Sequence, residues 1–193
     1  MDYYPRLAQS IDFIEDNLTC AISLEDVSQR AYSSLSHFHR IFAFMTGFGI
    51  NTTLENDQVA TDIPAFMDNF FINKKSGEIP GIIKPEIFYG IYSNLDVHNN
   101  FRFTIAYETK PLKQVPEELE QHVIPPRNYA VFTATGPMPE KLVNAWHYIY
   151  GNWLPNSPYE RETGIDFEVY DTRTLQENIA SVDIYIPLKI VQQ

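Results

Sequence analysis

Two halves of the chain carry similar strings about 78 residues apart, and this internal repeat is what most restricts the fold. Tyr89-Gly90-Ile91-Tyr92 in the first half corresponds to Phe167-Glu168-Val169-Tyr170 in the second, and Tyr107 corresponds to Tyr185. A period of this length is too long for a solenoid and indicates a duplicated unit. Each half is expected to contain a strand, a helix and two more strands, so that both units share one antiparallel sheet with both helices on one face.

Short β-branched and aromatic runs mark the strands of this unit. Strands are expected at residues 49–54, 86–92, 101–109, 119–124, 128–135, 165–171 and 182–188, with the run at 119–124 as an extra strand. Two interruptions carry helical signals, one with Pro64 in its first turn and one opened by Pro139. Their apolar side chains recur at helical spacing and are expected to pack on the sheet: Phe66, Phe70 and Phe71 in the first, and Leu142, Trp146, Ile149 and Trp153 in the second.

Residues before about Gly47 have a helical pattern instead. Ser23 and Ser34 are placed to cap a second and a third helix, and Gly47 is expected to end the third. This third helix is expected to bury one apolar face, made by Phe38, Ile41, Phe42 and Met45. Three short helices with a tight turn between the second and third are typical of a helix-turn-helix.

We therefore expect an α+β protein in two parts. Residues 1–47 form a short helix-turn-helix-like segment, and residues 48–193 form a duplicated β-α-β-β ligand-binding domain. Phe38, Phe42 and Phe44 cannot all be buried within so small a helical bundle. The helices are therefore expected to dock onto the larger domain or to mediate self-association, as in a homodimer.

Charge restricts the class of partner. The chain has 14 Lys and Arg against 25 Asp and Glu, which gives a net charge of -11. Such a surface repels phosphate backbones and anionic lipid, because nucleic-acid affinity depends mainly on neutralisation of phosphates by cationic side chains. Basic or neutral small molecules are the expected partners, and DNA binding is expected to be weak.

Several other sites and locations are not expected. Cys20 is the only cysteine, so no internal disulfide is expected. No apolar run approaches the roughly 18 residues of a membrane span, and no signal peptide is recognisable, so we expect a cytoplasmic protein without a membrane partner. There is no glycine-rich phosphate loop, and no cofactor is expected. No metal is expected either, because none of the five histidines has a partner at ligand spacing: His37, His39, His98, His122 and His147.

Glu168 is the side chain best suited to ligand binding. Alternation along its strand puts it on one face with Asp166 and Tyr170, while Phe167 and Val169 are expected to face the helices. The site is therefore expected on a concave face turned away from the helices, in a cleft between the two halves.

The other half supplies the opposite wall. Gly90 occupies the place equivalent to Glu168 and leaves room for a ligand, and Tyr92 mirrors Tyr170. Aromatic walls around one buried acid favour a flat, hydrophobic cation. The alternative is that Glu168 is a solvated strand acid with a local arginine partner. The remaining expected ligand-binding residues are Tyr107, Trp146 and Trp153.

Residues 11–47 resemble the first helix-turn-helix of AraC-type transcriptional regulators. The resemblance rests on Ile22-Ser23-Leu24-Glu25-Asp26-Val27, Ser34-Leu35-Ser36-His37-Phe38-His39-Arg40-Ile41-Phe42 and Gly47. It implies four candidate DNA contacts, at Ser36, His37, His39 and Arg40. The second helix-turn-helix of that family is missing, and residues 1–47 hold three arginines and no lysine against six acids. A single acidic unit of this kind should bind DNA weakly.

Five strings after Phe48 carry a second resemblance: Thr61-Asp62-Ile63-Pro64-Ala65-Phe66, Ile87-Phe88-Tyr89-Gly90-Ile91-Tyr92, Pro126-Arg127-Asn128-Tyr129-Ala130-Val131-Phe132, Ser157-Pro158-Tyr159-Glu160 and Phe167-Glu168-Val169-Tyr170. In these strings the chain, from Phe48 to the end, resembles the gyrase-inhibitor-like (GyrI-like, Rob/SOUL-type) small-molecule-binding domain. The resemblance implies a pocket glutamate at Glu168 that accepts lipophilic, often cationic, compounds.

Three functions remain open at this point. The first is binding of a lipophilic, cationic or aromatic small molecule by a regulator-like protein. The second is a DNA-binding AraC-type transcriptional activator. The third is a hydrolase, because some GyrI-like proteins hydrolyse strained cyclopropane-bearing electrophiles. In that case Glu168 would be the general base and Tyr129 or Tyr170 the hydrogen-bond donor, with burial raising the pKa of Glu168. Nothing in the sequence separates a binding carboxylate from a catalytic one.

Overall fold

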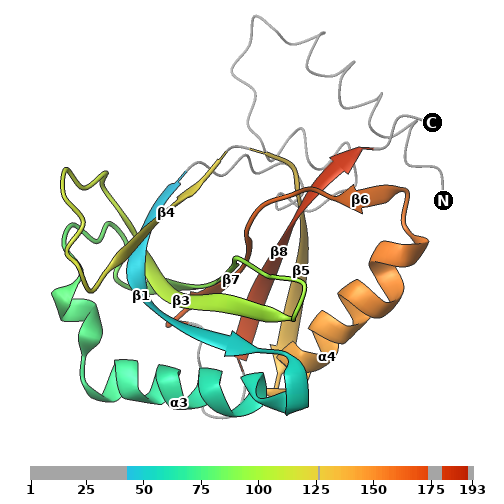
Figure 1. Cartoon of the computed structure of the whole chain (residues 1–193), viewed down its shortest axis with the longest axis horizontal. Coiled ribbons are helices and arrows are strands. Elements are labelled where there is room, and N and C mark those ends of the chain that lie inside the picture. Colours follow the sequence, from blue (N-terminus) through green and yellow to red (C-terminus); the bar gives the residue numbers. More distant parts are fainter. Residues whose placement is uncertain (1–42, 126, 174–179, 191–193) are drawn as a thin grey trace, which may run out of the picture.

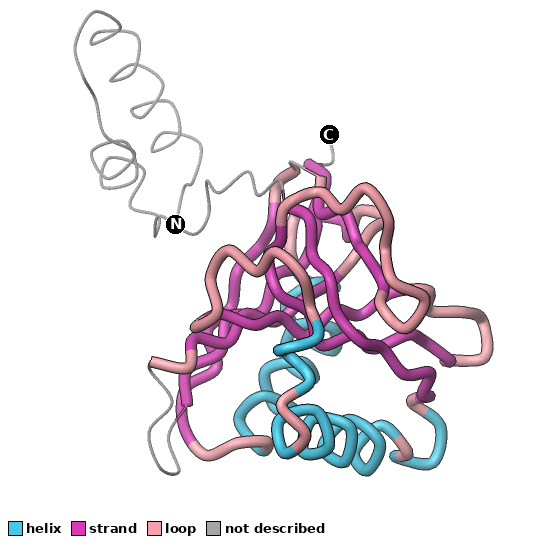
Figure 2. Tube along the Cα trace, turned by 90° about the vertical axis from the view of Figure 1, so that its left-hand side faces the viewer, coloured by secondary structure: helices cyan, strands magenta, loops and turns pink. Residues whose placement is uncertain are grey.

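The computed structural model describes residues 43–125, 127–173 and 180–190, which form one strongly curved antiparallel sheet of eight strands with two helices on one side (Figure 1). Figure 2 shows the helices together beneath the sheet, which confirms the expected α+β fold. The strands are β1 (Ala43–Thr53), β2 (Ile87–Ser93), β3 (Asn100–Thr109), β4 (Glu120–Ile124), β5 (Tyr129–Gly136), β6 (Tyr159–Arg161), β7 (Asp166–Asp171) and β8 (Ala180–Ile190). The helices are α3 (Val59–Ile72) and α4 (Glu140–Tyr148), with short turns η2 (Glu55–Asp57), η3 (Lys75–Glu78), η5 (Leu154–Asn156) and the π-helical η4 (Ile149–Trp153) that continues α4.

The strand order β4-β1-β3-β2-β7-β8-β5 confirms the duplicated unit. In chain order β1, α3, β2 and β3 correspond to β5, α4, β7 and β8, and the two sets meet at the β2–β7 pair. β4 is the extra strand that the run at 119–124 predicts. β6 pairs with β8 and was not predicted, because three residues are too few to show a period.

The repeat places one residue pair at the centre of the sheet. Gly90 of β2 lies directly opposite Glu168 of β7. These two residues also correspond to each other in the repeat, so the pseudo-two-fold axis passes between them. Tyr92 and Tyr170, two residues further along each strand, are therefore related by the axis and lie on either side of it.

Both faces of the sheet are buried. Phe70 of α3 packs on the helix side, whose buried residues include Phe88, Phe101, Phe103, Ile105, Tyr107, Tyr170 and Val182. The sheet also has the expected concave face turned away from the helices (Figure 1). This face is filled by its own side chains. They include Ala43, Met45, Tyr89, Ile91, Ala106, Ile124, Tyr129, Phe167 and Tyr185.

The prediction of which face of β7 the helices cover was wrong. Phe167 packs against Tyr129 on the concave face, with ring centroids 5.4 Å apart. Glu168 and Tyr170 point to the helix side, where Trp146 of α4 bonds to Glu168. Alternation correctly grouped Glu168 with Tyr170. It could not assign the face, because a strand with two buried faces has no polar side to identify the solvent.

The start of the sheet also differs from the expectation. β1 begins at Ala43, so Phe44, Met45 and Gly47 lie in a strand and not at the end of a helix. A Cβ at Gly47 would overlap the backbone carbonyl of Ile105 in β3, so the close approach of two strands requires glycine here. Over so short a run, apolar spacing does not distinguish a helix from a strand.

Most of the expected helix-turn-helix falls in residues 1–42, which lie outside the described residues. The same holds for the four candidate DNA contacts Ser36, His37, His39 and Arg40, and the division at residue 47 stays a prediction. In the described part of the chain, no helix is long and apolar enough to cross a membrane, and no three His, Cys, Asp or Glu side chains converge as a metal site requires.

Candidate functional site

Glu168 is buried at the centre of the sheet, between the two halves of the repeat. Its side chain is directed to the helix side and is 1% exposed. A Cβ at Gly90 would lie 2.8 Å from Glu168 Oε2 and 3.1 Å from the ring of Phe103. The missing side chain at Gly90 therefore gives space to the carboxylate itself.

Three neutral groups donate hydrogen bonds to this carboxylate. The Tyr92 hydroxyl donates to Oε1 at 2.9 Å, and the Tyr170 hydroxyl donates to Oε2 at 2.7 Å. The two repeat-related tyrosines thus take one oxygen each. The indole Nε1 of Trp146 donates to Oε1 at 2.6 Å. No cationic side chain among the described residues bonds to Glu168. These contacts therefore do not include the local arginine partner that the alternative interpretation of Glu168 predicts.

The protein environment works against a charge at this position. Burial raises the pKa of Glu168 above its usual value of 4.5, and the three hydrogen bonds only partly offset this. Burial and the neighbouring carboxylate together raise the pKa of both Tyr92 and Tyr170 well above 10, so both hydroxyls remain donors. A buried anion bonded only to neutral donors is incompletely compensated, and a cation from outside would complete it.

The raised pKa of Glu168 predicts a pH dependence of stability. Above pH 4.5 the folded state holds this proton more tightly than the unfolded state does, until the folded-state pKa is passed. The free energy of unfolding of the wild type should therefore fall, relative to Glu168→Gln, as pH rises from about 4.5 through the raised pKa. Urea denaturation of both proteins over this range measures the difference, and a difference that does not vary with pH would contradict the prediction.

The ring of Tyr170 connects Glu168 to an apolar groove. This ring stacks on Phe88 with centroids 4.5 Å apart and an interplanar angle of 5°. A groove of about 330 Å³ opens beside this stack, between α3 and the segment that leads into α4. Its lining is Met67, Phe71, Phe88, Met138, Tyr170, Thr172 and Ala180. One tyrosine therefore contacts the acid with its hydroxyl and the groove with its ring.

Trp146 covers the acid from the helix side. Its ring lies edge-on to Tyr92 at 5.1 Å and stacks on Tyr150 at 6.0 Å. The side chain is only half-buried, whereas the carboxylate beneath it is not exposed. A ligand that reaches Glu168 from this side must take the place of the indole N–H.

The structure does not bring every predicted site residue to Glu168. Tyr129 lies on the concave face, so the predicted catalytic pair of Glu168 and Tyr129 is not formed. Tyr107 lies on the helix side but contacts Phe70 and Phe88, not the acid. Trp153, at the end of η4, packs against Phe132 at 4.9 Å and Tyr159 at 6.1 Å, not against the acid.

Sequence reasoning also missed residues of the site. Met67 and Met138 line the groove, and nothing in their spacing indicates it. Helical spacing predicts a core position for Phe71, but its side chain is 42% exposed beside the groove. It immediately follows Phe70, so the two cannot both face the sheet, and this is a signal that the sequence contains.

A duplicated β-α-β-β sheet with two helices on one side is the GyrI-like effector-binding fold. The family model for Cass2, described as an integron-associated effector binding protein, matches residues 43–188, and the chain belongs to this family. It is also 28% identical over 130 residues to the Bacillus subtilis (strain 168) protein YobU, which is named as a candidate transcriptional regulator. That match covers 66% of this chain and 79% of YobU.

Two solved structures show the same fold. The structure of SAV2435 bound to tetraphenylphosphonium has a TM-score of 0.61 and 14% identity, and covers 77% of this chain and 89% of its own. The integron cassette protein VCH_CASS2 from the mobile metagenome of Vibrio cholerae has a TM-score of 0.57 and 23% identity, and covers 77% and 91%. The chain is therefore an effector-binding domain with regulator-like relatives.

Proposed function

We propose that this protein binds a lipophilic cation on the helix side of the sheet, with Glu168 as the counter-ion, and that binding serves a regulator-like role. The observation that carries the proposal is the buried carboxylate of Glu168, which has three neutral donors and no cation among its described contacts. A charged group so placed is costly unless it is paired, and the ligand would supply the pair.

The neighbouring groove supports a lipophilic ligand. Its apolar and polarisable surface lies next to Tyr170, which bonds to the acid, and is provided by Phe71, Phe88, Met67 and Met138. Aromatic faces also attract cations, above all when both are desolvated. SAV2435, which shares this fold, was solved with tetraphenylphosphonium, a cation shielded by aromatic rings. The same compound is therefore a suitable first probe for this chain.

Two ions of the same shape and opposite charge test the proposal. Calorimetric titration with tetraphenylphosphonium should show saturable binding, and titration with tetraphenylborate should show none, because the borate presents a negative charge to Glu168. Equal binding of both ions would mean that shape alone determines affinity. Absence of binding by the phosphonium ion would overturn the proposal.

Entry of the ligand also predicts a change at Trp146. The chain has two tryptophans, so the Trp153→Phe variant leaves Trp146 as the only indole. Binding of tetraphenylphosphonium should break the bond from Trp146 to Glu168 and shift its emission in a saturable way. Trp146→Phe is the matched control, since the remaining Trp153 has Phe132 and Tyr159 as its ring contacts and its emission should not shift. A shift confined to Trp153 would contradict this placement of the ligand.

We further propose that the regulator-like role involves an AraC-type segment that precedes β1 and has weak DNA affinity. Support comes from the sequence resemblance and from the net charge of -11, which opposes approach to phosphates. For the hydrolase alternative, Tyr129 is separated from Glu168 by the sheet, and Tyr170 is the one of the two candidate donors that bonds to the acid.

A further inference from the structure

β7 directs two acids to the helix side, and these two acids have different kinds of bonding partner. Asp166 and Glu168 are two residues apart on one strand, so their side chains share a face at a spacing of about 7 Å. Glu168 bonds only to neutral donors, whereas Asp166 forms an ion pair with Arg161. This face of β7 therefore carries one acid with an internal counter-ion and one without.

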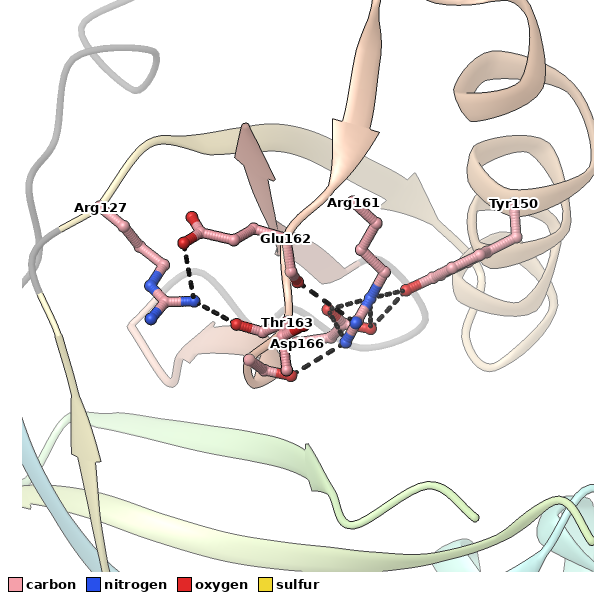
Figure 3. Close-up of polar contacts among 7 residues, drawn as sticks. Arg127, Tyr150, Arg161, Glu162, Thr163 and Asp166 are labelled. Atoms are coloured by element: carbon pink, nitrogen blue, oxygen red, sulfur yellow. Dashed lines mark hydrogen bonds and ion pairs between the residues drawn. The ribbon is translucent and has the colours of Figure 1, made fainter. Parts of the chain in front are cut away.

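The Arg161 guanidinium is fixed on Asp166 from several sides (Figure 3). Its Nη2 lies 2.9 Å from Oδ1 of Asp166, and its Nε lies 3.2 and 3.3 Å from the two carboxylate oxygens. The guanidinium also donates to the Tyr150 hydroxyl at 3.0 Å and to the backbone carbonyl of Gly164 at 3.0 Å. Tyr150 in turn donates to the other oxygen of Asp166.

We infer that Arg161 occupies a second cation position on this face of β7 and thereby restricts the ligand to a single positive charge. The inference rests on the proposed function, because it takes Glu168 as the position for the ligand's cation. Arg161 is on this view a specificity-determining residue that acts through Asp166.

The position of this pair along β7 supports such a role. At one end of this face of β7, Tyr170 lines the apolar groove, and at the other end Tyr92 lies opposite Asp166. The side chains of Arg161 and Asp166 are 32% and 11% exposed, so this end reaches solvent. A second charged group on an extended ligand would therefore come to Asp166, where it would meet a guanidinium.

The neighbouring charged residues do not change this difference between the paired Asp166 and Glu168, which has no internal counter-ion. Arg127 and Glu162, which lie beside the pair in Figure 3, face each other at 3.9 Å and offset one another. Removal of the Arg161 charge alone would leave two carboxylates about 7 Å apart. Such a pair is suited to a dication whose charges are separated by two aromatic rings.

A matched pair of probes tests the inference. N-methyl-4-phenylpyridinium has one charge on a two-ring framework, and methyl viologen has two charges on a similar framework. Displacement of tetraphenylphosphonium measures the affinity of each. The wild type should prefer the monocation, and Arg161→Gln should shift the ratio toward the dication by at least tenfold. Arg161→Lys keeps the charge and should keep the wild-type preference.

Two variants at Asp166 separate charge from loss of structure. The double variant Arg161→Gln with Asp166→Asn removes both charges and should restore the preference for the monocation. Asp166→Asn alone leaves Arg161 uncompensated near Glu168, and should weaken tetraphenylphosphonium binding by about tenfold even if Arg161→Gln does not fold.

The outcomes distinguish this inference from the function on which it rests. If tetraphenylphosphonium does not bind the wild type, the proposed function fails. If it binds, but the ratio of the two probes is the same in Arg161→Gln and the wild type, the inference about Arg161 is overturned. The inference is also overturned if neither probe displaces tetraphenylphosphonium from the wild type or from Arg161→Gln. It is likewise overturned if Arg161→Lys has the same probe ratio as Arg161→Gln.

Discussion

Replacement of Glu168 by glutamine should weaken binding of tetraphenylphosphonium by about thirtyfold or more. The variant removes the negative charge but keeps a side chain of similar size, so the groove beside Tyr170 is retained. Loss of one partner of a buried charge pair costs about 2–5 kcal/mol, and each 1.4 kcal/mol is about tenfold in affinity. A neutral ligand such as triphenylphosphine oxide should lose little.

Calorimetric titration of the wild type and Glu168→Gln measures this loss. The matched control is Glu160→Gln, which removes an exposed acid of β6 that pairs with Lys189 at 2.6 Å. The control changes the net charge by the same amount, so it should change affinity by less than about twofold, as surface pairs contribute little. Equal losses in both variants would mean that overall charge, not the buried carboxylate, attracts the cation.

The symmetry of the fold explains why a single acid carries so much of the proposed function. The repeat supplies a tyrosine from each half, Tyr92 and Tyr170, and each donates to one oxygen of Glu168. At the axis itself two side chains cannot occupy one position, and the halves differ there. Gly90 removes the side chain on one strand so that the carboxylate on the other can occupy the shared space.

This part of the site could be predicted from sequence because the repeat aligns it. The period of about 78 residues is enough to match Gly90 with Glu168 and Tyr92 with Tyr170, and the β2–β7 register agrees with the first match. Strand alternation then groups Glu168 with Tyr170 on one face. Local patterns are sufficient because these residues all lie on the two central strands.

The rest of the site depends on how the helices pack, and no local pattern contains that information. Trp146 reaches Glu168 from α4 only because the helices cover this face of β7. Arg161 lies in β6, a strand too short to predict, and bonds to Asp166 across the turn between β6 and β7. Tyr129 has the chemistry of a suitable donor, but its strand directs it to the concave face.

Substitution of Gly90 by alanine should both destabilise the protein and weaken cation binding. The new Cβ would lie 2.8 Å from Glu168 Oε2 and 3.1 Å from the ring of Phe103. Phe103 is fully buried and cannot move away, so the carboxylate must shift and lose its bond from Tyr170. Overpacking of this kind costs about 1–3 kcal/mol of stability. The displaced carboxylate should also reduce tetraphenylphosphonium affinity by about tenfold.

Urea denaturation and calorimetric titration measure the two effects separately. Gly77→Ala in η3 is the matched control, because a Cβ there has no neighbour within 4 Å, and both stability and affinity should be unchanged. Wild-type affinity in a destabilised Gly90→Ala variant would show that the carboxylate does not need its present position to bind the cation. If Gly90→Ala is as stable as the wild type, the carboxylate moves freely. Because Gly90 is the residue that makes room for the acid at the axis, loss of both properties together would identify the axis of the repeat as the centre of the ligand site.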